Sequence, residues 1–322
     1  MKFPILLKKI RNSIRHFETK FKNNIKFLFH FGAPRYASLI TNKFYFIKKA
    51  FKAKSNCSES KNVEIHMLLN KKRIYEGTWA LSSLLLHCGP KSKIFIHNDG
   101  TISENDKKII IDRIGFFKYK FIDKDFSDKF VTNILLKNNL LKTKKLRDDL
   151  IFSLKLIDPL VFSEEDDLII MDSDVIFYQK PTELLSSKEK FLYSPDNNDQ
   201  CYCINIGEFH EKYGSKMISK FNPGVFKLNK KNINLNQIEE LLEMDGFYKN
   251  GKPSYFAELT IWACIMSLNN AKSLGSLYQI CPPNPDEEGI IFGHYCGGQF
   301  WAENFYAKGI NLTRKKITQN PA

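Results

Sequence analysis

The chain has 322 residues, of which 43% are hydrophobic, and this is enough for one large α/β domain or two small ones. The net charge of +14 is unevenly placed, because residues 1–54 contain 14 Lys and Arg against Glu18 alone and the remainder is almost neutral. The body therefore lacks the charge expected of a nucleic-acid groove, and nucleic acid is not an expected partner. None of the seven cysteines forms a CxxC pair, so we expect reduced thiols in a cytoplasmic protein.

Residues 1–30 carry apolar side chains every three or four positions, which predicts one helix with an apolar stripe made of Phe3, Leu7, Ile10, Ile14, Phe17, Phe21, Ile25 and Leu28. Lysines and arginines lie between them, and no apolar run reaches the length of a membrane span. Such a helix is typical of proteins that bind anionic membrane surfaces, so we expect residues 1–54 to hold the protein at the inner face of a membrane. A helix that packs on the body, or one that binds a partner, is the alternative.

A second basic and aromatic piece spans residues 43–52, and residues 55–62 have the composition of a linker. The expected division is thus an extension over residues 1–61 and a domain over residues 62–322. The domain begins with predicted strands at residues 63–69, 93–97 and 117–122. Helices at residues 79–88, capped by Thr78, and at residues 104–114, between Ser103 and Gly115, separate these strands. This order predicts a parallel sheet with right-handed crossovers, and residues 130–162 are expected to be helical.

The stretch from Asp167 to Tyr178 is an apolar run, then Asp172 and Asp174, then a second apolar run. The first run predicts a buried strand, in which residues i and i+2 point to the same side, so both carboxylates are expected at its carboxyl end. Two carboxylates this close repel each other unless a cation lies between them, which predicts a divalent metal that holds a diphosphate. One alternative is a structural pair that caps backbone N–H groups. Another is a phosphotransferase like the haloacid dehalogenases, with Asp172 as nucleophile and Asp174 as acid.

Beyond this stretch we expect a short helix from Thr182, a strand at residues 191–193, an irregular segment at residues 194–220 and a turn at residues 221–224 that leads into a strand. Helices are predicted after the caps Asn234 and Ser254. His294 then follows an apolar run and precedes a pair of glycines. Two carboxylates and an imidazole together suit Mn²⁺.

Three motifs, in this order, resemble the nucleotide-sugar glycosyltransferases of the GT-A fold, particularly the glycogenin and lipopolysaccharide galactosyltransferase group. They are Asp172-Ser173-Asp174, similar to the family's DxD motif; Phe221-Asn222-Pro223-Gly224-Val225, similar to its Asn-x-Gly-Val strand; and His294-Tyr295-Cys296-Gly297, similar to the start of its HxxGxxKPW motif. The likeness extends from about Val63 to Trp301. It implies a Rossmann-like, mixed and mostly parallel sheet flanked by helices, behind a basic helical N-terminal extension.

The resemblance also implies roles for individual residues. Asp172, Asp174 and His294 would ligate Mn²⁺ or Mg²⁺. A nucleotide-sugar donor, expected to be a UDP-sugar, would be held by residues around these ligands: Asn70, Tyr75, Asp99, Lys155 (or Arg147, two turns earlier), Ser173, Gly224 and Gly297. Asn222 would face the sugar or the acceptor, and Glu258 would orient the acceptor hydroxyl or act as its general base.

The sequence departs from the family pattern where Phe300-Trp301 stands in place of Lys-Pro-Trp, and Lys308 or Arg314 is the candidate replacement for the missing charge. The expected function is metal-dependent transfer of a sugar to a glycan or glycolipid acceptor at the cytosolic membrane face, as in lipopolysaccharide or capsule biosynthesis. The alternative is a non-catalytic membrane-binding or partner-binding protein built on a degenerate transferase body.

Overall fold

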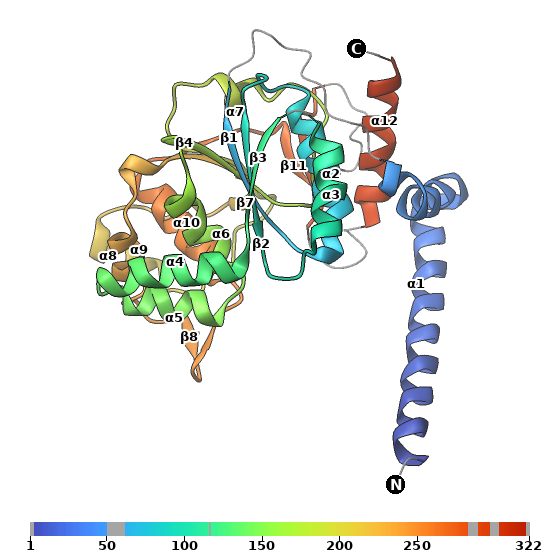
Figure 1. Ribbon diagram of the computed structural model, residues 1–322, viewed down its shortest axis with the longest axis horizontal. Coiled ribbons are helices and arrows are strands. Elements are labelled where there is room, and N and C mark those ends of the chain that lie inside the picture. The colour runs from blue at the N-terminus through green and yellow to red at the C-terminus, as the bar shows by residue number, and fades with distance from the viewer. Residues whose placement is uncertain (1–2, 50–61, 116, 283–288, 297–302, 320–322) are drawn as a thin grey trace.

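A computed structural model describes residues 3–49, 62–115, 117–282, 289–296 and 303–319 of the protein (Figure 1). A seven-stranded sheet lies at its centre, in the order β10-β6-β7-β4-β1-β2-β3. The strands are β1 (Glu64–Leu69), β2 (Lys93–Asn98), β3 (Lys118–Ile122), β4 (Asp167–Met171), β6 (Leu192–Pro195), β7 (Phe221–Asn229) and β10 (Lys272–Ser273). Strands β4, β1, β2 and β3 are parallel, and β7 is antiparallel to both of its neighbours. The predicted mixed, mostly parallel sheet is confirmed.

Helices cover both faces of this sheet, as Figure 1 shows. One face packs against α2 (Ile74–Leu85) and α3 (Glu104–Ile114). The other packs against α4 (Lys124–Lys137), α5 (Leu141–Asp149), α6 (Ser153–Phe162), α8 (Ile206–Tyr213), α9 (Leu235–Leu241) and α10 (Ala257–Leu268). The alternation of β4 divides its side chains between the two layers, with Leu168 and Ile170 in the second and Ile169 in the first. Burial on both faces fixes the register of the strand that leads to the two aspartates.

The second apolar run of the central stretch forms a separate strand, β5 (Val175–Phe177), after which comes the short helix α7 (Thr182–Ser186). Strand β5 belongs to a small sheet with β11 (Tyr278–Ile280) and β12 (Phe292–His294). Strand β12 is antiparallel to β5 and parallel to β11. A hairpin of β8 (Tyr248–Lys249) and β9 (Lys252–Pro253) precedes α10, and η3 (Lys230–Asn232) follows β7. The small sheet brings a distant part of the chain against the end of β4.

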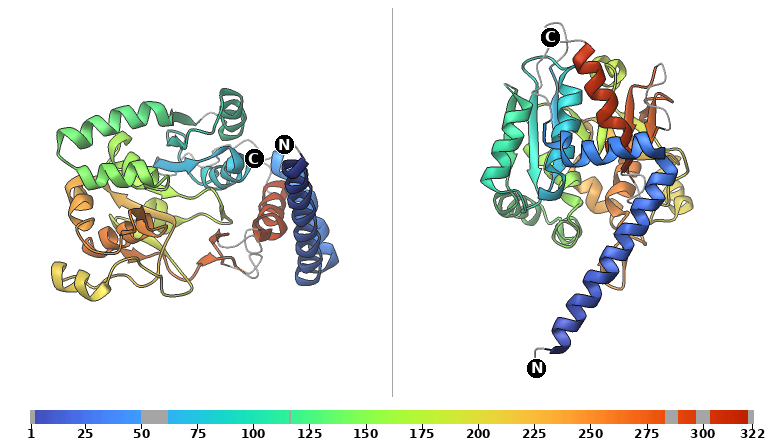
Figure 2. Two further views of the ribbon diagram at one scale, coloured as in Figure 1. Left: turned by 90° about the horizontal axis from the view of Figure 1, so that it is seen from below. Right: turned by 90° about the vertical axis from the view of Figure 1, so that its right-hand side faces the viewer.

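The predicted N-terminal helix is present as α1 (Phe3–Phe44), with a break at Gly32, where φ is +73°. Figure 2 shows the segment before this break projecting from the body and the segment after it lying across the C-terminal helix. That second segment and η1 (Phe46–Lys49) contact η4 (Phe305–Gly309) and α12 (Ile310–Gln319). Asn42 Nδ2 donates to the carbonyl of Tyr306 over 2.7 Å. In the described part of the chain, no helix combines the length and the hydropathy needed to cross a bilayer.

Several predicted boundaries are wrong. Helix α2 begins at Ile74 rather than after Thr78, since η2 (Lys71–Arg73) leads straight into it. Gly77 lies inside this helix and not in a loop. A glycine is needed there because a Cβ would come within 2.6 Å of the Leu69 side chain on β1. Residues 130–162 are largely helical, as predicted, and belong to α4, α5 and α6, whereas α8 lies within the segment expected to be irregular.

Two further boundaries differ. Strand β7 already includes the predicted turn at Phe221, and α10 begins at Ala257 rather than directly after Ser254. The hydroxyl of Ser254 accepts the backbone N–H of Phe256 just before that helix. The predicted linker at residues 55–61 lies outside the described residues, and of the described cysteines only Cys88 and Cys264 are buried.

Candidate active site

The two predicted aspartates lie where β4 ends, in a turn that leads into β5. The antiparallel pairing of β5 with β12 places His294 opposite Val175, directly beside Asp174. Nε2 of His294 lies 3.3 Å from Asp174 Oδ1 and 3.6 Å from Asp172 Oδ2. One ligand atom from each of Asp172, Asp174 and His294 lies within 4.8 Å of the other two. The structure thus brings together three side chains whose outer members are more than 120 residues apart in the sequence.

The orientation of the His294 ring is set by Asn222 on β7. His294 Nδ1 lies 2.7 Å from Asn222 Oδ1, and the backbone N–H of Gly224 donates to the same oxygen over 2.9 Å. Because an amide oxygen only accepts hydrogen bonds, Nδ1 must carry the proton, and Nε2 faces the carboxylates. The ring also requires a glycine beneath it: a Cβ on Gly224 would lie 2.3 Å from His294 Nδ1.

Both polar atoms of the Asn222 amide make hydrogen bonds within the protein. Its nitrogen donates to Asp196 Oδ2 over 2.8 Å, and only 2% of the residue is exposed. These contacts give Asn222 a role in positioning His294, and its expected contact with a sugar or an acceptor stays a prediction. Asp196 itself was missed in the sequence. Its position could have indicated a role, because it directly follows β6, next to β7, and ligands of such sheets bind at the carboxyl ends of strands.

Lys155 of α6 lies behind the two aspartates. Its Nζ donates to Asp172 Oδ1 over 2.6 Å and to the carbonyl of Pro223 over 2.8 Å, and it lies 3.7 Å from Glu258 Oε1. Lys155 and Glu258 are 4% and 7% exposed, so this is a buried ion-pair cluster. Sequence reasoning singled out both residues, and the structure brings them together at Asp172.

Charges in this cluster shift the pKa values of its members. Burial raises the pKa of Glu258 to about 7, although Lys155 opposes the shift. Burial also raises the pKa of Asp174, but the hydrogen bond with His294 and the charges of His294 and Arg73 outweigh it and leave the pKa of this carboxyl below its ordinary value. Burial likewise opposes a charge on His294, yet Cys296 and Asp174 raise the pKa of its imidazole. In this state His294 is a proton donor to the acidic pair, and cation binding would have to release that proton.

Of the other predicted donor-binding residues, Ser173 and Gly224 adjoin the acidic pair, and the backbone N–H of Asp172 donates to the carbonyl of Gly224 over 2.9 Å. Asn70 and Asp99 follow β1 and β2, and both side chains accept backbone N–H groups of their own loops, from Lys72 and Thr101. Tyr75 is partly buried against the cluster that contains α1 and η4, and Ser173 is half-buried between the two aspartates. Gly297 lies outside the described residues.

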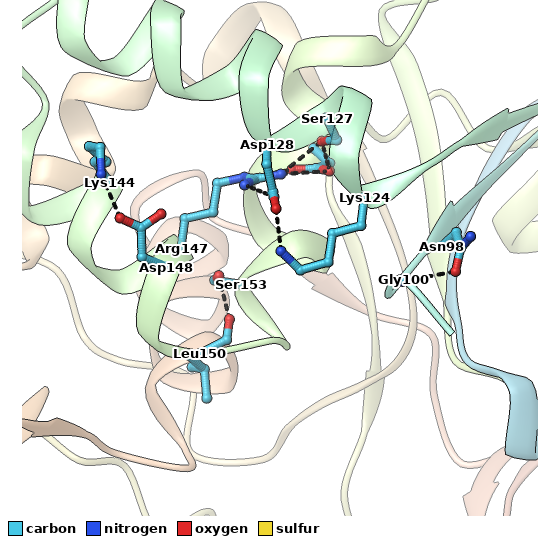
Figure 3. A network of polar contacts seen from close by, with 11 residues as sticks. Asn98, Gly100, Lys124, Ser127, Asp128, Lys144, Arg147, Asp148, Leu150 and Ser153 are labelled. Atoms are coloured by element: carbon cyan, nitrogen blue, oxygen red, sulfur yellow. Dashed lines mark hydrogen bonds and ion pairs between the residues drawn. The ribbon is translucent and has the colours of Figure 1, made fainter. Parts of the chain in front are cut away.

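Arg147, the second candidate for contact with the donor, has a structural role instead (Figure 3). Its guanidinium bonds Asp158 over 3.1 Å, Asp128 over 2.6 Å and Ser127 over 2.7 Å, and its side chain is 2% exposed. It ties α4, α5 and α6 together. Figure 3 also shows Lys124 bonded to Asp128 at the edge of this network.

Arg314, a candidate to replace the missing phosphate-binding lysine, instead contacts η1 and α1. Its guanidinium carbon lies 3.3 Å from the centre of the Phe46 ring, and its Nη1 donates to Asn42 Oδ1 over 3.2 Å. Lys308 is half-buried on η4, and burial followed by the charge of Arg35 lowers the pKa of its amine. Arg73 is a cation that the sequence reading missed, and its charge reaches Asp174.

No protein-family model and no curated protein sequence matches this chain. Solved structures are similar to it, among them the following two. One is the apo form of mouse xyloside xylosyltransferase 1, at 14% identity and a TM-score of 0.50, with 72% of this chain and 97% of that chain covered. The other is the galactosyltransferase LgtC in complex with donor and acceptor sugar analogs, at 13% identity and a TM-score of 0.50, with 81% and 97% covered. At such identities the likeness shows the fold, which disfavours the haloacid dehalogenase alternative. The predicted GT-A fold is confirmed, and this chain shares it with structurally characterised glycosyltransferases.

Proposed function

We propose that the protein is a metal-dependent glycosyltransferase that moves a sugar from a nucleotide-diphosphate donor, most simply a UDP-sugar, to a glycan or glycolipid acceptor. The observation that carries the proposal is the convergence of Asp172, Asp174 and His294 within 4.8 Å at the carboxyl end of the central strand of a GT-A fold. This is the edge at which open α/β sheets bind ligands.

The three side chains fit a divalent cation. Carboxylate oxygens suit Mg²⁺ and Mn²⁺ alike, and the imidazole favours Mn²⁺. Asn222 fixes the tautomer that leaves Nε2 free toward the carboxylates, which is the arrangement typical of a ligating histidine. A bound cation would offset the charge that grows on the leaving diphosphate.

The remaining residues would position the substrates. Lys155 donates a hydrogen bond to Asp172 and lies beside Glu258, so its positive charge faces both carboxyl groups. Glu258, with a pKa of about 7, can accept a proton from an acceptor hydroxyl near neutral pH. Asn70, Tyr75 and Asp99 would border the nucleoside, whereas Ser173 and the backbone at Gly224 would border the donor sugar and its phosphates.

The outer segment of α1 would hold the enzyme at the cytoplasmic face of a membrane, peripherally. Its support is the excess of Lys and Arg in residues 1–54 and the projection of this segment from the body (Figure 2). Ile25, Leu28 and Phe29 are 40%, 39% and 84% exposed there, so apolar surface accompanies the charge. Sedimentation with phosphatidylglycerol vesicles and with an oligonucleotide, for the full chain and for a chain without residues 1–31, tests this. Vesicle binding that survives the deletion would contradict it.

The transferase proposal is tested by incubating the protein with a panel of nucleotide-sugars and Mn²⁺ and measuring nucleotide release. We expect release with at least one donor, loss of release in EDTA, and loss in Asp174→Asn. Asp149→Asn, a change at an exposed surface carboxylate on α5, is the matched control and should keep full activity. Full activity of Asp174→Asn in EDTA would overturn the proposal. Absence of nucleotide and metal binding would favour the non-catalytic alternative.

A further inference from the structure

Three exposed aromatic side chains form a cluster that neither the core nor the proposed metal site uses. Phe152 lies at the start of α6, and Tyr255 and Phe256 lie just before α10. Their exposed fractions are 38%, 69% and 42%. The Tyr255 ring lies 5.4 Å from that of Phe152 at 85°, and 5.4 Å from that of Phe256 at 87°. We call these three residues the aromatic ledge.

The aromatic ledge lies beside the proposed reaction centre. Phe152 precedes Lys155 by one helical turn, and Tyr255 precedes Glu258 by about the same distance along the chain. The pair of aromatic rings and the pair of buried charges therefore bridge the same two segments, and each ring lies three residues before its charged neighbour. Because α6 leads into the parallel strand β4, its start lies at the end of the sheet where Asp172 follows β4.

A buried acceptor atom lies on Glu258, three residues after Tyr255, and makes no hydrogen bond. Oε1 of Glu258 receives no hydrogen bond from the described residues, although the residue is only 7% exposed. A buried acceptor atom without a hydrogen bond is unfavourable, so a partner is expected in the working state. The separation of 3.7 Å from Lys155 Nζ is too long for a hydrogen bond. A hydroxyl group is the partner that suits a carboxyl oxygen, whereas a hydrocarbon cannot supply it.

A pyranose ring satisfies both features at once. It has an apolar face of C–H groups, which can pack on an aromatic ring, and hydroxyls at its edge, which can reach a carboxylate. Exposed tyrosine and phenylalanine give a large contact area with little loss of side-chain entropy. We propose that the aromatic ledge binds a pyranose ring of the acceptor glycan and presents one of its hydroxyls to Glu258. This proposal names the class of acceptor for the proposed transferase, and it rests on that proposed function.

The test is saturation-transfer difference NMR on the full chain without donor or metal, so that its result does not depend on turnover. The probes are methyl β-D-glucopyranoside, methyl β-D-galactopyranoside and octyl β-D-glucopyranoside. We expect saturation of the ring protons of at least one methyl pyranoside. Removing one ring in Tyr255→Ala or Phe152→Ala should weaken that binding about three- to tenfold, the worth of one aromatic contact. Phe130→Ala, which removes a comparably exposed aromatic ring from α4, is the matched control and should bind as the unchanged chain does.

Three results would overturn the inference: no saturation of any probe, saturation confined to the octyl chain, or equal binding by Tyr255→Ala and the control. Saturation confined to the octyl chain would show that the aromatic ledge binds lipid. Equal binding by Tyr255→Ala and the control would show that it binds none of these probes. Thermal unfolding of each variant verifies that it is folded. If the pyranosides bind at the aromatic ledge while no nucleotide-sugar is turned over, the transferase proposal fails and the sugar-binding site stands.

Discussion

Replacing Gly224 with alanine is the sharpest test of how the site is built. The added Cβ would lie 2.3 Å from His294 Nδ1, 2.7 Å from its Cγ and 2.8 Å from Asn222 Oδ1. Ordinary heavy-atom contacts need about 3.5 Å, so the imidazole must retreat by roughly 1 Å. That movement breaks the hydrogen bond of 2.7 Å between His294 and Asn222, which fixes the side of the ring that faces Asp172 and Asp174.

We expect Gly224→Ala to bind Mn²⁺ about 10- to 100-fold more weakly, the usual cost of losing the group that orients a metal-ligating histidine. Crowding should also lower the free energy of unfolding by about 1–3 kcal/mol. The assay is a titration with Mn²⁺ that follows the EPR signal of the free ion, together with urea unfolding. Gly207→Ala on α8 is the matched control, since its Cβ would approach only Asn205 Oδ1, at 3.2 Å. Mn²⁺ affinity equal to that of the control, in a folded variant, would refute this account of the site.

Three further changes test other parts of the structure. Arg147→Met leaves Asp158 buried without its cation and should lower the free energy of unfolding by about 3–5 kcal/mol in urea; a loss no larger than that of an exposed Arg would contradict the network. Ser103→Ala removes the hydroxyl of the capping box with Asp106 on α3 and should lower the free energy of unfolding by about 1 kcal/mol, without change in donor binding. Glu258 has its pKa raised from 4.5 to about 7 by burial, so the folded protein binds more protons than the unfolded chain between these values. Its contribution to stability is therefore fully present below pH 4.5 and lost as the pH rises to about 7, whereas transfer that uses Glu258 as a base should increase over the same range. Glu258→Gln should remove both trends, and an unchanged pH profile of transfer would show that this carboxyl is not the base.

The parts of the fold predicted best are those with dense local signals. Ser103 and Gly115 bound α3 as predicted, because both ends of that helix are capped by short-range contacts. The strands of the parallel sheet were recognisable by their apolar runs, since both faces of the sheet are covered. The start of α2 was not, because Gly77 looks like a loop residue unless the strand it packs against is known.

The residues of the candidate site likewise differ in how far local sequence signals predict them. Asp172 and Asp174 form a recognisable pair at the end of a strand, and His294 stands out by the apolar run before it and the glycines after it. No local pattern relates Asn222 to His294 or Lys155 to Glu258, because these contacts depend on strand and helix packing over 72 and 103 positions. Arg147 illustrates the opposite error: a cation near the predicted site is bound by two aspartates from neighbouring helices.

The contact between the two ends of the chain bears on the order in which the protein folds. Asn42 and Tyr306 are separated by 264 positions, and the entropy cost of closing such a loop is about 5 kcal/mol. The inner segment of α1 therefore cannot dock until the far end of the chain has formed η4, and Leu39 stays uncovered until then. A helix that is made first and docks last is free to meet a lipid surface before the domain behind it is complete.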